Sequence, residues 1–130
     1  WNSINTKQYI DQANQISHGL LRLGIKKDDK IAVISSTNRT EWNVMDIGIL
    51  QLGAQNVPIY PTISKEDYEY VLNHSGAIYC FVSDTTILEK LNQIKEIHNL
   101  KVYILLTLLK VKQIGKRLYN LAKIMTIKKK

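Results

Sequence analysis

The sequence predicts an α/β domain in which alternating βα units form a mostly parallel sheet with helices on its faces. The first observation is the run Ile31–Ile34, which is continuously apolar and bounded by polar residues, as in a strand buried on both faces. The second is that short apolar runs alternate with segments of helical periodicity along the first hundred residues. Strands that alternate with helices of ten or more residues are typical of βαβ crossovers.

The first helix is expected over about residues 6–23. Asn5 and Gln8 have the spacing of a capping box, and Gly24 stands where a helix is commonly terminated by a left-handed residue. One face is apolar at spacings of four, three, four and three, at Tyr9, Ala13, Ile16, Leu20 and Leu23. This pattern predicts an amphipathic helix with one buried face.

A second helix is expected after the strand Ile31–Ile34. Asn38 and Glu41 match a capping box, which predicts a helix that starts near Arg39. From residue 42 to residue 52 apolar side chains fall almost all round the helix, so we expect burial on several sides.

Both prolines of the chain follow, at positions 58 and 61. Pro58 lies late in a short strand expected over residues 55–59, where the missing N–H indicates an edge or a strand end. Pro61 then ends the strand. Ser64 is expected to cap a third helix, which Gly76 terminates.

The remaining elements repeat the alternation. A strand is expected over residues 77–82, followed by a helix that Asp84 caps and a last strand over residues 101–106. The helix places four apolar side chains on one face, at Ile87, Leu88, Leu91 and Ile94.

The candidate binding loop is Ser35–Arg39, because it follows a strand and precedes a helix. Ligands of open α/β sheets bind at this edge, and hydroxyls, free helix N–H groups and an arginine suit a phosphate or a carboxylate. The loop lacks a glycine that lets the backbone approach a phosphate closely. We therefore interpret it as a capped helix start and a solvated turn.

No catalytic, cofactor-binding or metal-binding residue is assigned from the residues. His18, His74 and His98 have no partner at metal-ligand spacing, and Cys80 lies mid-strand without a neighbouring base that lowers its pKa. Cys80 is expected to be a buried structural thiol. The sequence contains none of the common short motifs for phosphate loops, dinucleotide sites or nucleophile elbows.

The net charge of +7 does not indicate nucleic-acid binding, because of where the charge lies. Residues 1–100 carry 9 basic and 11 acidic side chains, whereas residues 101–130 carry 9 basic side chains and no acid. The single cysteine fits a reducing compartment, so we expect a cytoplasmic protein. The longest apolar run, about residues 102–109, is shorter than the ~20 residues of a membrane-spanning helix.

Five motifs follow one another at a recognisable spacing. They are a helix ending in L-x-x-x-G, the strand D-D-K-I-A-V-I, N-R-T-E-W, G-A-Q-N-V-P-I-Y-P-T and S-K-E-D-Y, all within residues 19–84. Together they resemble the N-terminal region of AMP-forming acyl-CoA synthetases, most closely the long-chain fatty acid branch. The opening residues 1–9 also fit the family pattern W-x-x-x-T-x-x-x-Y at Trp1 and Tyr9, whereas Asn5 stands at the threonine position and Thr6 follows it. One departure is Asp28, where the family usually has glycine.

The resemblance implies the N-terminal subdomain of the adenylate-forming fold and a ligase reaction. Such enzymes use ATP and Mg²⁺ to convert a fatty acid to an acyl-adenylate, and coenzyme A then displaces AMP to give the thioester. The family's phosphate loop, its Y-G-x-T-E segment, its ribose-binding aspartate and its C-terminal lysine are absent from these residues. We therefore expect a fragment that is inactive alone, that holds no cofactor and that carries no catalytic residue.

The last segment has a different composition from the rest. Residues 1–99 are expected to form the partial AMP-binding subdomain, and residues 100–130 a basic tail that diverges from the family. In residues 101–130, 18 of the 30 side chains are Ile, Leu or Lys, the composition that an AT-rich gene yields when read out of frame. A frameshifted or truncated gene product is the interpretation we favour.

Two alternatives stay open. Residues 101–124 form a basic segment that is also suited to peripheral contact with an anionic membrane, which would make the chain a membrane-associated module. The other alternative is a nucleotide-binding α/β module that uses the loop Ser35–Arg39.

Overall fold

The structure, a computed structural model, describes residues 3–105 and Asn120, and it confirms the expected α/β class. Four parallel strands form one sheet in the order β2-β1-β3-β4. The strands are β1 (Lys30–Ile34), β2 (Gln55–Ile59), β3 (Tyr79–Val82) and β4 (Val102–Leu105). The helices are α1 (Thr6–Arg22), α2 (Thr40–Leu50), α3 (Lys65–Ser75) and α4 (Thr85–Asn92).

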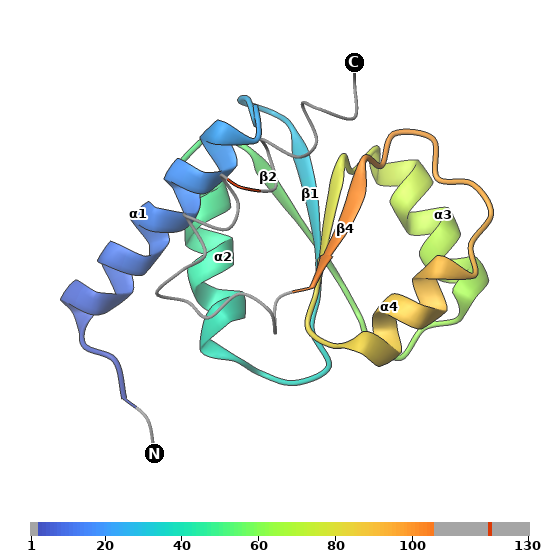
Figure 1. The fold of residues 1–130 in the computed structure, drawn as a ribbon, viewed down its shortest axis with the longest axis horizontal. Helices are drawn as coiled ribbons and strands as arrows, with labels where there is room; N and C mark the ends of the chain where they lie inside the picture. The colour runs from blue at the N-terminus through green and yellow to red at the C-terminus, as the bar shows by residue number, and fades with distance from the viewer. Residues whose placement is uncertain (1–2, 106–119, 121–130) are drawn as a thin grey trace.

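The sheet lies between two helical layers, with α1 and α2 on one face and α3 and α4 on the other (Figure 1). Strand β1 contributes to both cores because successive side chains of a strand point to opposite faces. Ile31 and Val33 pack under α1 and α2, whereas Ala32 and Ile34 pack under α3 and α4. The expected burial of this strand on both faces is confirmed.

Strand β2 is an edge of the sheet, as Pro58 predicted. Pro58 pairs with Val33 in the β1–β2 register, and β2 has no strand on its other side among the described residues. A proline fits there because an edge strand does not need every N–H for pairing. The strand ends at Ile59, two residues before Pro61.

Three of the four predicted helix caps are present. Asn5 and Gln8 form a reciprocal capping box, Ser64 accepts from the backbone N–H of Asp67, and Asp84 accepts from that of Ile87. Each bond satisfies a backbone N–H group that the first helical turn leaves without a partner.

The capping box predicted at Asn38 is wrong. The N-cap of α2 is Arg39, which has extended backbone and no side-chain cap bond. Glu41 instead accepts a hydrogen bond of 3.1 Å from the Arg39 guanidinium. A capping box requires the Glu41 side chain to bond back to the start of the helix, but this side chain is bonded to Arg39 instead.

The two helices of the first layer approach closely at Gly48. A Cβ built there would lie 2.5 Å from Ile16 Cγ2, so only glycine fits without a shift of α1. The buried Ser17 hydroxyl bridges the helices, 2.8 Å from the Gly48 carbonyl oxygen and 2.7 Å from Gln51 Oε1. Small and polar groups thus align α1 with α2. The expectation that α2 is buried on several sides holds only in part, since Leu50 is 52% exposed.

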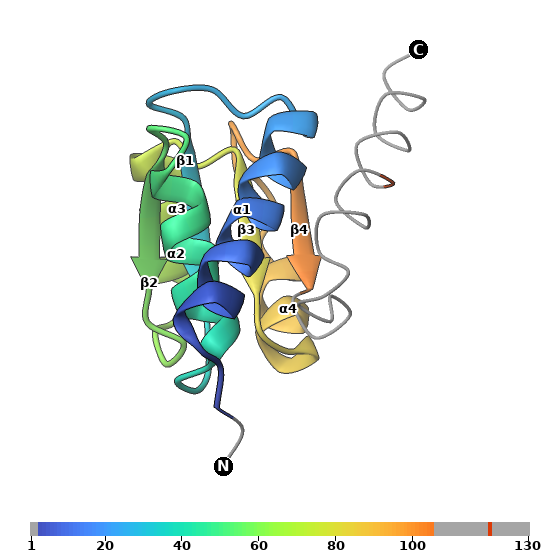
Figure 2. The same ribbon diagram turned by 90° about the vertical axis from the view of Figure 1, so that its left-hand side faces the viewer.

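Most of the basic tail lies outside the described residues, including residues 106–119 and 121–124 of the segment considered for membrane contact. Its first part, β4, pairs with β3 and buries Ile104, so the sheet extends past residue 99 (Figure 2). In the described part of the chain, no helix has both the length and the apolarity needed to cross a bilayer.

Asp28 adopts the left-handed backbone that glycine favours, with φ of +67°. The family's usual glycine at this position therefore has a physical reason, since a Cβ in this conformation costs about 1 kcal/mol or more. Aspartate tolerates the conformation better than most residues because its short side chain can bond locally. The turn is held by the Asp28 N–H, which donates to the Gly53 carbonyl at 2.9 Å.

We predict that Asp28→Gly is more stable than Asp28→Ala by about 1 kcal/mol, because only alanine pays the left-handed cost. The free energy of unfolding is measured by urea titration. Asp11, exposed in α1, is the control position, and there alanine should be more stable than glycine by about 1 kcal/mol. The same order at both positions would contradict the left-handed turn.

Candidate functional site

The carboxyl ends of β1 and β3 form the switch point of the sheet. From β1 the chain crosses through α2 to β2 on one side, and from β2 it crosses through α3 to β3 on the other side. The two crossovers cover opposite faces (Figure 1), so the loops after β1 and β3 diverge. Ligands of open α/β sheets bind in the crevice at such a point.

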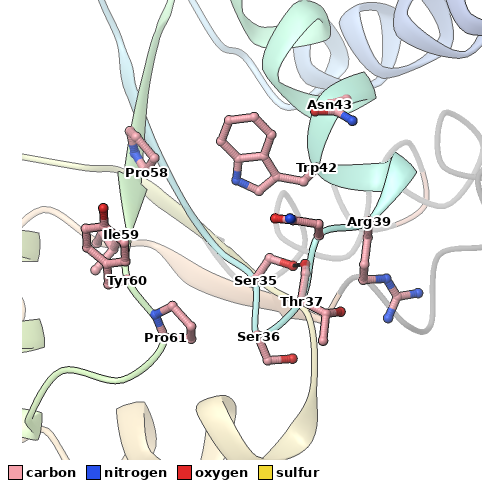
Figure 3. Close-up of a pocket in the computed structure, with 11 residues that line it drawn as sticks. Ser35, Ser36, Thr37, Arg39, Trp42, Asn43, Pro58, Ile59, Tyr60 and Pro61 are labelled. Carbon is pink, nitrogen blue, oxygen red and sulfur yellow. Dashed lines mark hydrogen bonds between the residues drawn. The ribbon is translucent and has the colours of Figure 1, made fainter.

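A cleft of about 760 Å³ opens beside this point, between the ends of β1 and β2. One wall is the loop Ser35–Arg39, here called the hydroxyl loop, with Trp42 and Asn43 of α2. The other wall is residues 58–61, the first part of residues 58–63, here called the proline segment. Figure 3 shows the two walls facing each other, with the Trp42 indole projecting from the start of α2.

The hydroxyl loop is tied to the loop after β3. The Ser36 N–H donates to Ser83 Oγ at 2.9 Å, and the two hydroxyl oxygens lie 3.2 Å apart. The Ser83 hydroxyl is only 1% exposed and donates to Asp84 Oδ2 at 2.9 Å. Within the loop itself, the Ser35 hydroxyl donates to the Thr37 carbonyl at 2.6 Å. The serines therefore brace the switch point, in addition to presenting hydroxyls to the cleft.

The one arginine of the cleft lining is paired inside the protein. Its hydrogen bond to Glu41, the largest cause, raises the pKa of Arg39, and the same bond lowers the pKa of Glu41. The Glu41 carboxylate thus neutralises much of the positive charge with which Arg39 was expected to bind a phosphate. The hydroxyl loop therefore differs from the capped helix start that we expected, because Arg39 pairs with Glu41 and Asn38 does not cap α2.

Asp84 completes the network at the switch point. The hydrogen bond from the Ser36 hydroxyl is the largest cause of its lowered pKa, and backbone N–H groups of α4 and the Ser83 hydroxyl add to the effect. Its ionised form is therefore the one that the folded chain favours.

The remaining candidates lie apart from the cleft. Cys80 is fully buried in β3, and burial raises the pKa of its thiol, which confirms a structural thiol. His18 is exposed on α1, and His74 stacks on Tyr70 of α3 with ring centroids 5.5 Å apart. His98 faces Glu96 at 3.3 Å. The described residues contain no cluster of three or more His, Cys, Asp or Glu side chains suited to a metal ion.

Sequence reasoning treated the two prolines and the hydroxyl loop as separate features. The structure places Pro58, Pro61 and Trp42 around the same cleft. Neighbouring parallel strands end at the same edge of a sheet, so pairing β1 with β2 is the step that brings them together. The strand lengths alone did not show which strands were neighbours.

A family model described as "AMP-binding enzyme" matches residues 1–121. The chain belongs to the AMP-binding enzyme family. The match covers the whole described fold and continues past residue 99.

Curated relatives of this chain include long-chain fatty acid–CoA ligases and fatty acyl-CoA synthetases. Long-chain-fatty-acid--CoA ligase FadD15 of Mycobacterium bovis is 36% identical over 81 residues, which is 62% of this chain and 13% of that protein. Fatty acyl-CoA synthetase B of Dictyostelium discoideum is 31% identical over 123 residues, 95% of this chain and 17% of that protein. The chain thus spans under a fifth of these relatives' length.

Solved structures of AMP-binding enzymes share the fold. A Mycobacterium tuberculosis fatty acyl CoA synthetase matches with a TM-score of 0.77 and 20% identity over 87% of this chain and 22% of that chain. An anthranilate CoA ligase, AuaEII, in complex with anthranoyl-AMP, matches with a TM-score of 0.73 and 22% identity over 85% of this chain and 22% of that chain. These likenesses confirm the adenylate-forming fold.

The cofactors that the family implies do not fit the described residues. Mg²⁺ prefers several oxygen ligands, and no carboxylate cluster is present in residues 3–105. The hydroxyl loop has no glycine, and its arginine is paired with Glu41. Among the described residues of the cleft lining, the one arginine is thus already bonded to a carboxylate of the protein.

We predict that Asp84→Ala lowers the free energy of unfolding by about 1 kcal/mol at pH 7, the usual cost of a lost helix cap. A carboxylate whose pKa is lowered by folding stabilises the folded state at pH values above its unfolded pKa, which is near 3.8 for Asp84. That contribution is lost as the pH falls through the pKa of the folded state. The difference from wild type should therefore shrink on acidification below about pH 3.8.

Urea titrations at pH 7 and at pH 2.5 measure this effect. Asp84→Asn is the matched control, because asparagine caps helices as well as aspartate but does not titrate. An Asp84→Ala penalty of equal size at both pH values would contradict the ionic part of the network.

Proposed function

We propose that these residues are the N-terminal framework of a long-chain fatty acid–CoA ligase. The observation that carries the proposal is the family match over residues 1–121 together with relatives named for that activity. The reaction converts a fatty acid, ATP and coenzyme A to acyl-CoA, AMP and pyrophosphate. The partners are accordingly small molecules, and a cytoplasmic location stays a prediction.

The contribution of the framework is positional. A sheet buried between two helical layers holds the ends of β1 and β2 rigidly, and the cleft opens at those ends. Phosphoryl and adenylyl chemistry also needs donors for the phosphates and a metal site, which the family supplies from segments that these 130 residues lack. We infer that the chain does not adenylate a fatty acid by itself.

The expected result for the 130-residue chain is no pyrophosphate exchange into ATP above background when a C16 fatty acid and Mg²⁺ are added. A full-length long-chain fatty acid–CoA ligase serves as the positive control under the same conditions. Exchange that depends on the fatty acid would contradict the framework role.

A second candidate function is binding of a nucleotide by the cleft alone, favoured by its position beside the switch point and by its Trp42 ring. Titration calorimetry with AMP tests it on the same sample. We expect no measurable heat of binding, because Arg39 is paired with Glu41. Saturable binding that Ser36→Ala weakens would instead establish this function.

The boundary between residues 99 and 100 also stays a proposal. We propose that the segment 100–130 diverges from the family through a frameshift, supported by its freedom from acids and its Ile, Leu and Lys content. The family match up to residue 121 is the observation that stands against a boundary at residue 99. Sequencing the locus beyond codon 130 tests this. A family phosphate loop in another reading frame is the expected result, whereas one uninterrupted frame that ends at Lys130 in many isolates would overturn it.

A further inference from the structure

The proline segment is bonded to two side chains that come from α3 and α4 and do not line the cleft. The Tyr68 hydroxyl donates to the Tyr60 carbonyl at 3.1 Å, and the Lys90 ammonium donates to the Ile63 carbonyl. Tyr60 itself is 80% exposed on the cleft side and packs little. The position of this wall therefore depends on hydrogen bonds to two backbone carbonyls, together with the packing of Ile59 and Ile63 on the core under α3 and α4.

Lys90 and Tyr68 act as one unit. The Lys90 ammonium lies 5.5 Å from the centroid of the Tyr68 ring, within the range of a cation–π contact. Tyr68 is fully buried in α3, and burial, the largest cause, raises the pKa of its phenol, so its hydroxyl stays a donor. A buried ring thus orients the lysine towards Ile63.

The same short helix also holds the opposite wall. Asp84 caps α4 and accepts a hydrogen bond from the Ser83 hydroxyl. The Ser83 hydroxyl oxygen in turn accepts a hydrogen bond from the backbone N–H of Ser36 in the hydroxyl loop. Lys90 lies in the last turn of α4. One end of α4 is thereby bonded to the hydroxyl loop and the other end to the proline segment.

We propose that α4 sets the width of the cleft, with Lys90 as the positioning residue of the proline segment. Lys90 does not line the cleft itself and acts through the Ile63 carbonyl. The identity of the ligand in the cleft rests on the proposed function. The role of Lys90 does not, because the geometry of the walls can be measured without a ligand.

The test compares Lys90→Met, Lys90→Arg and Lys95→Met in the full 130-residue chain. Methionine keeps an apolar stem but removes the charge and the donors, arginine keeps both, and Lys95 is an exposed lysine five residues further on. Tyr68→Phe is a second variant, which removes only the hydroxyl bond to Tyr60.

Backbone ¹⁵N order parameters of Thr62 and Ile63 are the first readout. We expect them to fall from about 0.85, the value of a rigid backbone, to below about 0.6 in Lys90→Met. Tyr68→Phe should lower the value at Tyr60, whereas Lys90→Arg and Lys95→Met should match the wild type. Values in α1 should not change in any variant.

The second readout is the fluorescence of Trp42, which lies across the cleft. The substitution Trp1→Phe in every variant leaves Trp42 as the single tryptophan. We expect acrylamide to quench Trp42 about twofold more strongly in Lys90→Met, with rescue in Lys90→Arg. Unchanged order parameters and quenching in Lys90→Met, or a loosening spread equally over the chain, would overturn the proposal. Neither readout uses ligase activity or a ligand, so the failure of this inference and the failure of the proposed function are distinguishable.

Discussion

The structure depends on the double pairing of β1. This strand is bonded to β2 on one side and to β3 on the other, and its alternating side chains supply both hydrophobic cores. Burying a side chain of the size of isoleucine or valine contributes about 1.5–3 kcal/mol. A strand with four buried residues and two partners is therefore the element that aligns both helical layers and fixes where the cleft opens.

Two polar residues of the cleft lining, Ser36 and Arg39, are bonded to side chains outside the lining. Arg39 pairs with Glu41, and Ser83 links Ser36 to Asp84 across the switch point. In a preorganised site, free donors point to the place where a ligand develops charge. Here the donors hold loops in place, which is the physical basis for regarding this region as a framework within an AMP-binding enzyme.

Local sequence signals predicted the elements well because they act over a few residues. The capping residues Asn5, Ser64 and Asp84 each satisfy a backbone N–H three residues further on, and the structure shows all three bonds. The prediction at Asn38 failed because Glu41 had a nearer partner in Arg39. Two equally local interactions competed for one carboxylate, and the sequence pattern did not rank them.

The sequence by itself determined the fold class and the kinship with acyl-CoA synthetases, since these follow from periodicity and motif order. The missing N–H of Pro58 left an edge or a strand end open, and the sheet order then placed the strand at an edge of the described sheet. Tertiary structure decided that both prolines, Trp42 and the hydroxyl loop share one cleft, and that Lys90 reaches the carbonyl of Ile63. These contacts join residues that are distant in the sequence and that lie on different strands, helices and loops. They exist only once the sheet order β2-β1-β3-β4 has brought the strand ends together, and local patterns do not encode that order.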